Sequence, residues 1–175
     1  MQFSKFESAL YLVIAEAMGT KSPMKGYEFL DGFRSGHVLV GDESDPIYAI
    51  FSFPNKSDDC YIMISDGDPE ELAKEMSALQ NYNEITAHLC KNHTVPTESK
   101  YLNEAGWQAY LVTSPKITFG DFPANHIVDN REIRFHLALP ISDKERMLKM
   151  ESGIESLFDF FSGNQRDTIT FHQKV

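Results

Sequence analysis

The sequence contains few of the residue groupings that metal-binding and catalytic proteins use. Its 175 residues include two cysteines, Cys60 and Cys90, too few for a disulfide framework. No phosphate-binding loop, dinucleotide fingerprint or G-x-S-x-G turn occurs. His88, Cys90 and His93 form the closest grouping of possible metal ligands, but no second cluster completes a set of four. We therefore expect no catalytic residues, no metal and no cofactor, and two buried, reduced thiols.

The sequence also lacks a long apolar run. A membrane-spanning helix needs about 18 or more such residues, so we expect no membrane-spanning segment. The apolar stretch at residues 9–15 falls on one face of a predicted helix, which begins at the capping box of Ser4 and Glu7 and ends at Gly19. This pattern favours a folded amphipathic helix over a signal peptide, and hence a cytoplasmic protein.

Positive charge is scarce. The chain has 16 Lys and Arg against 26 Asp and Glu, a net charge of −10, which opposes nucleic-acid binding. Strands at residues 47–53 and 60–65 would form a hairpin, so that the acids flanking it meet at one end. We predict that this end binds a basic partner protein; the alternative is a solvated face that only aids solubility. The predicted surface consists of Asp42, Glu43, Asp45, Asp66, Asp68, Glu70 and Glu71.

Hydrophobic periodicity predicts the remaining elements. A second helix begins at the N-cap Asp68, with Leu72, Ala73, Met76 and Leu79 on its inner face. Further strands are expected at residues 37–40, 84–90, 107–113 and 167–172. The connector before residue 37 is expected to be a loop, with a short helix possible at residues 27–30. Strands and helices are interspersed without a regular β-α-β-α order. This favours one α+β domain over residues 1–175, with a mixed sheet of six or seven strands covered by two long helices and one shorter helix.

Residues 131–163 form the most informative segment. Ile133, Phe135, Leu137 and Leu139 alternate with polar or small residues, which predicts a strand that Pro140 ends. Ser142 and Glu145 form a capping box that starts a long amphipathic helix, closed near Gly163. Its expected inner face is Met147, Met150, Ile154, Leu157, Phe158 and Phe161.

This strand–helix unit resembles the C-terminal part of Suppressor of fused-like domains. The matching residues are Leu139, Pro140, Ile141, Glu145, Lys149, Gly153, Leu157 and Phe161. Residues 47–89 are loosely similar, although Ile64-Ser65-Asp66-Gly67 replaces the strand end typical of the family. The resemblance implies a non-enzymatic protein-binding domain. The animal member holds a transcription factor, and small bacterial members act largely as immunity proteins against secreted toxins.

Two alternatives remain open. One is a small hydrolase-like enzyme with a pocket near Trp107, Arg134 and His136, although Trp107 is by default a core anchor and His136 a solvated residue. The other is an oligomer-forming protein, which an exposed patch at Phe119 and Phe122 would indicate.

Overall fold

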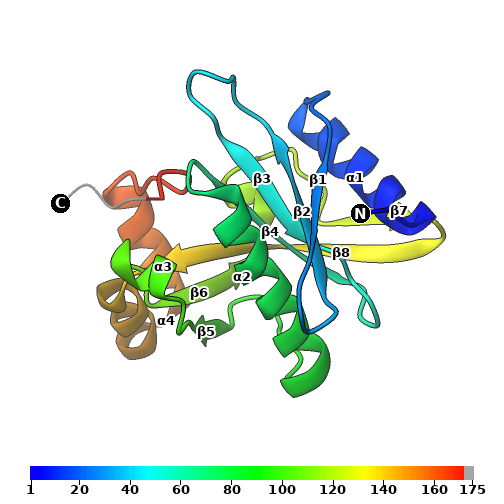
Figure 1. Ribbon diagram of the computed structural model, residues 1–175. Coiled ribbons are helices and arrows are strands. Elements are labelled where there is room, and N and C mark those ends of the chain that lie inside the picture. Colours follow the sequence, from blue (N-terminus) through cyan, green and yellow to red (C-terminus); the bar gives the residue numbers. More distant parts are fainter. Residues whose placement is uncertain (172–175) are drawn as a thin grey trace.

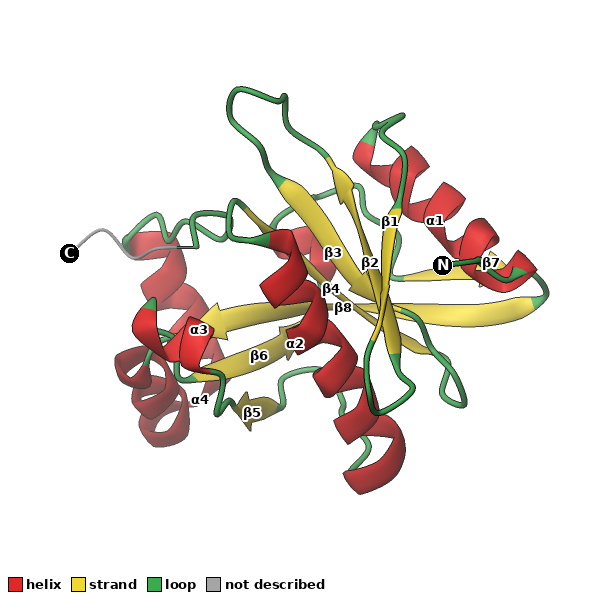
Figure 2. Ribbon diagram, in the orientation of Figure 1, coloured by secondary structure: helices red, strands yellow, loops and turns green. Residues whose placement is uncertain are grey.

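The computed structural model describes residues 1–171 and shows a mixed sheet of eight strands with helices on both faces (Figure 1, Figure 2). The strands are β1 (Lys25–Glu28), β2 (Arg34–Leu39), β3 (Tyr48–Ser52), β4 (Asp59–Ser65), β5 (Thr94–Pro96), β6 (Ala109–Thr113), β7 (Asn125–Val128) and β8 (Arg131–Ile141). The helices are α1 (Lys5–Met18), α2 (Pro69–Asn81), α3 (Lys100–Glu104) and α4 (Asp143–Gly163). The α+β class predicted from the sequence is confirmed, with eight strands instead of six or seven.

The strand order is β1-β2-β3-β4-β8-β6-β5, and β7 also pairs with β8. Strands β4 and β8 run parallel, whereas the other pairs are antiparallel. The predicted hairpin is present, because β3 and β4 pair with Tyr48 opposite Ser65. The loop of residues 41–47 and the start of α2 therefore lie at the same end of the sheet.

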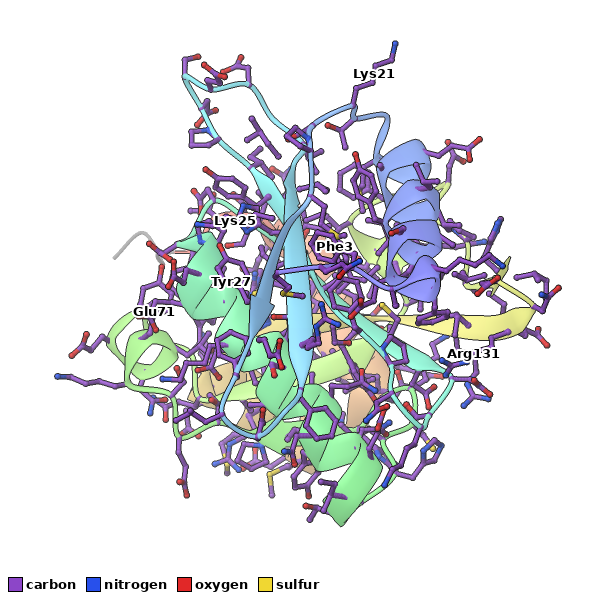
Figure 3. All side chains as sticks on the ribbon, turned by 45° about the vertical axis from the view of Figure 1, so that its right-hand side comes forward. Phe3, Lys21, Lys25, Tyr27, Glu71 and Arg131 are labelled. Carbon is purple, nitrogen blue, oxygen red and sulfur yellow. The ribbon has the colours of Figure 1, made fainter. Side chains whose placement is uncertain are left out.

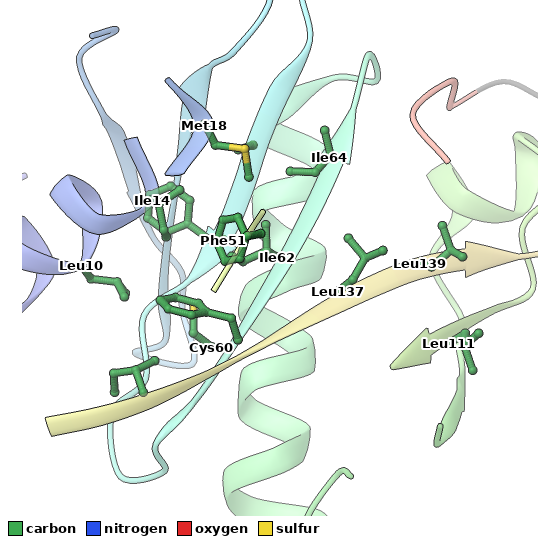
Figure 4. Packing of buried hydrophobic residues seen from close by; sticks show 14 of the residues in the cluster. Leu10, Ile14, Met18, Phe51, Cys60, Ile62, Ile64, Leu111, Leu137 and Leu139 are labelled. Carbon is green, nitrogen blue, oxygen red and sulfur yellow. The ribbon is translucent and has the colours of Figure 1, made fainter. Parts of the chain in front are cut away.

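Each face of the sheet has its own hydrophobic core. On one face, Leu10 and Ile14 of α1 and Leu157 of α4 pack against the inner side chains of the strands. Figure 4 shows the α1 residues facing Phe51 and Ile62, with α2 behind the sheet. On the other face, α2, α3 and the segment around Trp107 cover a second cluster. The strand residues of this second cluster are Ile50, Tyr61, Met63, Val95, Tyr110, Val112 and Ala138.

Both predicted capping boxes are present, and an arginine holds each one. Glu7 Oε2 accepts the backbone N–H of Ser4, while Glu7 Oε1 lies 2.9 Å from Arg34 Nη1 on β2. Glu145 repeats the arrangement at the start of α4, where its Oε1 accepts Arg166 Nε at 3.0 Å. A carboxylate that accepts both bonds fixes the helix start and the arginine together.

Residues 84–90 do not form the predicted strand. The chain continues from α2 through a π-helical turn at Tyr82–Thr86, and Ile85 is exposed. Glu84 holds this turn in place, because its carboxylate accepts the backbone N–H groups of residues 55–57 in the β3–β4 loop. The alternation of apolar residues did not reveal this long-range anchor, which overrides the local pattern.

Pro140 does not end β8, which runs on to Ile141. The Pro140 carbonyl accepts Arg166 Nη2 at 2.7 Å, and Pro140 lies opposite Tyr110 of β6. Proline is tolerated in a strand where the ladder does not need its missing N–H.

The predicted long helix α4 is broken at Gly153, whose φ of 86° and ψ of 174° are not helical. The break changes the face that the first half presents. Met147 and Met150 are exposed, whereas Leu157 and Phe161 of the second half are buried as predicted. Substitution of Gly153 by any other residue is expected to lower stability, because this backbone conformation is adopted almost only by glycine.

The expected strand at residues 167–172 is also absent from the described residues, and His172 lies outside them. Residues 167–171 form an irregular segment held to the end of β4: Asp66 N–H donates to the Ile169 carbonyl, and Phe171 N–H donates to Asp66 Oδ1 at 2.6 Å. Phe171 is buried as expected, against Tyr101 and Trp107.

The sequence missed four short elements. β1 replaces the loop, or short helix, expected around Tyr27, while β5 and α3 lie in the expected loop of residues 91–104. β7 lies in the expected irregular stretch of residues 115–130. All four have five residues or fewer, which is too short for a clear periodic signal.

We expect Leu157→Ala to lower the free energy of unfolding by about 2–5 kcal/mol, because it leaves a cavity in a fully buried position. Met150→Ala in the same helix removes an exposed side chain and is the matched control, with an expected effect within about 0.5 kcal/mol. Urea unfolding measures both. Equal effects of the two substitutions would contradict the docking of the second half of α4.

Candidate functional site

The seven carboxylates predicted as a partner-binding surface are all exposed. Asp42, Glu43 and Asp45 lie on the loop between β2 and β3, and the other four lie at the end of β4 and the start of α2. These two groups share one end of the sheet, because Tyr48 opposes Ser65. The structure therefore brings the predicted residues to one side of the molecule, and we call them the acidic surface.

Three of these carboxylates also hold the local backbone. Asp42 Oδ1 accepts the Ser44 hydroxyl and the N–H groups of Asp45 and Ser44, and these bonds lower the pKa of Asp42. Asp66 accepts Phe171 N–H, and Asp68 caps α2 by accepting the N–H groups of residues 70 and 71. The remaining four, Glu43, Asp45, Glu70 and Glu71, serve no such side-chain role within residues 1–171.

An aromatic group that sequence reasoning missed lies next to the acidic surface. His37 of β2 contacts both Tyr27 of β1 and Tyr48 of β3, and the Tyr27 hydroxyl lies 3.1 Å from His37 Nδ1. Burial lowers the pKa of His37 to about 4, so its ring is neutral and shares a hydrogen bond with the Tyr27 hydroxyl. The sequence did not reveal this group because residues 25–28 were expected to lie in a loop, whereas they form β1.

One lysine of the chain already occupies this neighbourhood. Lys25 Nζ lies 5.2 Å from the centre of the Tyr27 ring and 3.9 Å from Glu70 Oε2. Figure 3 shows Lys25 and Tyr27 on β1, beside the start of α2 where Glu71 lies. The place accommodates an ammonium group between an aromatic ring and a carboxylate, which is a favourable setting for a cation.

The structure does not bring together the pocket of the enzyme alternative. Gln108, next to Trp107, donates to Ile141 at the end of β8, whereas Arg134 lies seven residues earlier on the same strand. At about 3.3 Å per residue these positions are about 20 Å apart. Trp107 is a core residue, as its default interpretation had it: it is 3 % exposed and donates to the Phe171 carbonyl.

Arg134 and His136 instead hold Asp59. The Asp59 carboxylate accepts Arg134 Nε at 2.8 Å, Arg134 Nη2 at 3.0 Å and lies 2.8 Å from His136 Nε2. Burial alone would raise the pKa of Asp59, but these hydrogen bonds and charges outweigh it and hold that pKa well below its usual range. His136 is therefore a partly buried, hydrogen-bonded residue and not the solvated one expected. Asp59, Arg134 and His136 thus connect β4 to β8, and this structural role accounts for their arrangement.

A second surface follows the edge strand β5. Two adjoining hollows of about 350 and 450 Å³ share Tyr82, Val95 and Pro96. The first contains Glu75 and Glu98, and the second contains Arg146 and Lys149. We call the combined feature the β5 groove. It has an acidic end, an apolar middle and a basic end. The sequence did not predict it because residues 84–90 were wrongly expected to form a strand.

A buried tyrosine at the acidic end of the β5 groove and a half-buried lysine at its basic end have shifted pKa values. Burial raises the pKa of Tyr110 well above its ordinary value, and its hydroxyl donates to Glu75 Oε2 at 2.8 Å. At the basic end, burial lowers the pKa of Lys149, whose ammonium donates to the Thr94 hydroxyl. No carboxylate pairs with Lys149 within residues 1–171, so its charge is left for solvent or a ligand.

The remaining candidates of the sequence are distributed as follows. Phe122 is buried and Phe119 packs against the core, so the exposed patch that would favour an oligomer is not formed by them. Cys60 is buried as expected, but Cys90 is exposed because the strand that was to bury it is absent. Among residues 1–171, no three His, Cys, Asp or Glu side chains gather in a way that would hold a metal ion. None of the helices in that range combines the length and apolarity that crossing a membrane requires.

Comparison with known proteins places this fold among relatives. A model of the suppressor of fused protein family matches residues 54–172. A solved suppressor of fused homologue from Neisseria gonorrhoeae superposes with a TM-score of 0.77 at 16% identity, over 97% of this chain and 95% of that chain. No curated protein matches the sequence.

Two further solved structures share the fold. A chain in the crystal structure of the Sufu–Fu complex has a TM-score of 0.70 at 10% identity, over 96% of this chain and 90% of that chain. The Drosophila Suppressor of Fused has a TM-score of 0.57 at 11% identity, over 96% of this chain but 49% of that chain. Because the family model covers most of the sequence, including the strand–helix unit that suggested the resemblance, the chain belongs to the suppressor of fused family.

Proposed function

We propose that this chain is a protein-binding module without enzymatic activity, which sequesters a basic partner protein as an immunity protein does. The observation that carries the proposal is the acidic surface: seven exposed carboxylates at one end of the sheet. A Sufu chain solved in complex with Fu supports protein binding as the kind of activity. The unpaired thiols Cys60 and Cys90 are consistent with a cytoplasmic location, which is part of the proposal.

The setting of Lys25 supports the sign of the partner's charge. It lies over Tyr27 and near Glu70 in the way that a partner's lysine or arginine would. Like charges at Asp68, Glu70 and Glu71 repel one another in the unbound protein, so a basic partner relieves an unfavourable arrangement as it binds.

The β5 groove is a second place where a partner segment fits. Its polarity suits an extended segment with a basic residue near Glu75 and Glu98 and an acidic residue near Lys149. The two surfaces make different predictions, because the acidic surface acts through long-range charge and the β5 groove through close contact.

The first experiment is a pull-down from the native host at low salt, with identification of the proteins that elute at moderate salt. A basic protein that elutes with increasing salt supports the proposal. Recovery of acidic or neutral partners alone, unaffected by salt, contradicts the acidic-surface part of it.

With the partner in hand, we expect neutralisation of Glu43, Asp45, Glu70 and Glu71 to slow association and to flatten its salt dependence. Exposed charges act mainly on the association rate, over a screening distance of about 8–10 Å at physiological salt. Asp42, Asp66 and Asp68 are left unchanged because they hold the backbone. The matched control neutralises four exposed acids elsewhere: Asp121, Glu151, Glu155 and Asp159. An equal loss from both sets, measured by stopped-flow or surface plasmon resonance, would mean that net charge alone matters.

A second pair of variants tests the β5 groove. Tyr82→Ala and Lys149→Glu remove its shared aromatic wall and reverse its basic end. If a partner segment lies there, we expect dissociation to accelerate by about tenfold or more with little change in association. Unchanged dissociation in both variants would exclude the β5 groove from the interface, while leaving the acidic surface to be judged by its own variants.

The pH dependence of stability follows from His37. Below pH 6.5 the unfolded chain binds a proton at this residue, whereas burial keeps the folded pKa near 4. Stability therefore falls as the pH decreases from 6.5 to about 4. We expect His37→Phe, which keeps a ring in the aromatic group, to make this decline shallower in urea unfolding across that interval. Identical slopes for the variant and the parent protein would contradict the buried, neutral histidine.

A further inference from the structure

A separate cavity of about 350 Å³ lies at the end of β2 and β3 that is farther from the acidic surface. It is open to solvent, and four segments line it: the start of α1, the turn before β2, the end of β3 and the turn between β7 and β8. Its apolar lining comes from Phe6, Phe33, Phe53 and Pro54. Its volume is within the range of pockets that bind small molecules.

The charged groups that line this cavity are balanced. Arg34 and Arg131 contribute two guanidinium groups, and Glu7 and Asp129 contribute two carboxylates. Arg34 and Glu7 pair with each other at 2.9 Å and neutralise each other. Arg131 pairs with Asp58 at 3.1 Å and Asp129 pairs with Lys5, and each still has an atom with bonding capacity that a ligand can use.

Arg131 is held with one side of its guanidinium unused. The group stacks on the Phe6 ring at 4.4 Å, and its Nε and Nη2 donate to Asp58 Oδ1 and the Ser57 carbonyl. Within residues 1–171, Arg131 Nη1 has no hydrogen-bond partner. A planar guanidinium fixed in this way presents its remaining donors in one direction, which suits a carboxylate.

Asp129 is the matching acceptor. Its Oδ1 pairs with Lys5, whose side chain is 84% exposed and therefore easily displaced, while Oδ2 has no partner among the described residues. Asp129 and Asn130 have φ values of 45° and 68°, so they form the tight two-residue turn of the β7–β8 hairpin. This turn fixes Asp129 and Arg131 on the two sides of Asn130, next to the same cavity.

We propose that this cavity binds a small zwitterion that carries an apolar group, the chemistry of a hydrophobic α-amino acid. The carboxylate lies at Arg131 Nη1, the ammonium at Asp129 Oδ2, and the apolar group against Phe33, Phe53 and Pro54. Because the charges of the cavity are balanced, a lone anion or cation leaves one of them facing a like charge, whereas a zwitterion satisfies both. This site is independent of the acidic surface and of the proposed function.

The test is an NMR titration of the full chain with L-phenylalanine, followed through the backbone amides of residues 4–7, 32–34, 53–55 and 129–131. We expect saturable shifts at these residues at millimolar ligand. Phenylacetate lacks the ammonium and phenethylamine lacks the carboxylate. We expect each of them to bind at least about tenfold more weakly than L-phenylalanine, which is the usual loss when one charged hydrogen bond is missing.

Two variants assign the charges. Asp129→Asn preserves the turn, since asparagine tolerates positive φ, and should weaken L-phenylalanine binding. It should strengthen phenylacetate binding, because the like charge that faces the lone carboxylate is removed. Arg131→Gln should weaken L-phenylalanine and phenylacetate binding but not phenethylamine binding. Thermal unfolding confirms that each variant folds, and Asp121→Asn is the control. Absence of saturable shifts up to about 10 mM in the parent protein, or equal affinity for all three compounds, overturns the proposal.

Discussion

The structure depends on β8, an eleven-residue strand that pairs with three others. It is parallel to β4 on one side and antiparallel to β6 and β7 on the other. Without these pairings the β1–β4 ribbon and the β5–β6 pair would be separate units with half-covered cores. Asp59 strengthens the join, because a buried carboxylate on β4 can be satisfied only when Arg134 and His136 of β8 are in register with it. Parallel pairing gains little from local contacts, so a charged anchor of this kind helps to specify one register.

Features that depend on residues close in the sequence were predicted better than features that depend on distant contacts. Capping boxes at Ser4 and Ser142 and the N-cap at Asp68 depend on neighbours within four residues, and all three were predicted correctly. The π-helical turn at residues 82–86 depends on the contact of Glu84 with the distant β3–β4 loop and was missed. The helix break was missed as well, although it lies at a glycine, Gly153. The exposure of the seven acidic residues was foreseeable from the hairpin, whereas the aromatic neighbours of that surface required knowledge of β1.

Opposite charge is distributed in an uneven way over this acidic protein. The acidic surface contains carboxylates whose only nearby ion pair is the long one between Lys25 and Glu70 among the described residues. Elsewhere three of the five arginines pair with carboxylates in the interior or at its rim: Arg34 with Glu7, Arg134 with Asp59 and Arg166 with Glu145. Because the strongest positive groups are already used to hold helices and strands together, the negative charge at the end of the sheet is left uncompensated. The same residues that stabilise the fold thus determine the sign of its surface.

The break at Gly153 has a consequence for how the sequence can change over time. The second half of α4 carries Leu157 and Phe161 into the core, so its substitutions are constrained by packing. The first half forms one wall of the β5 groove with Arg146, Lys149 and Met150, and of its residues chiefly Glu145 and Leu148 contact the interior. Because the break at Gly153 rotates the two halves of α4 independently, the groove-facing residues of the first half can be substituted without moving the core residues of the second half. A lineage of such proteins can therefore diversify the groove rapidly while its scaffold stays unchanged.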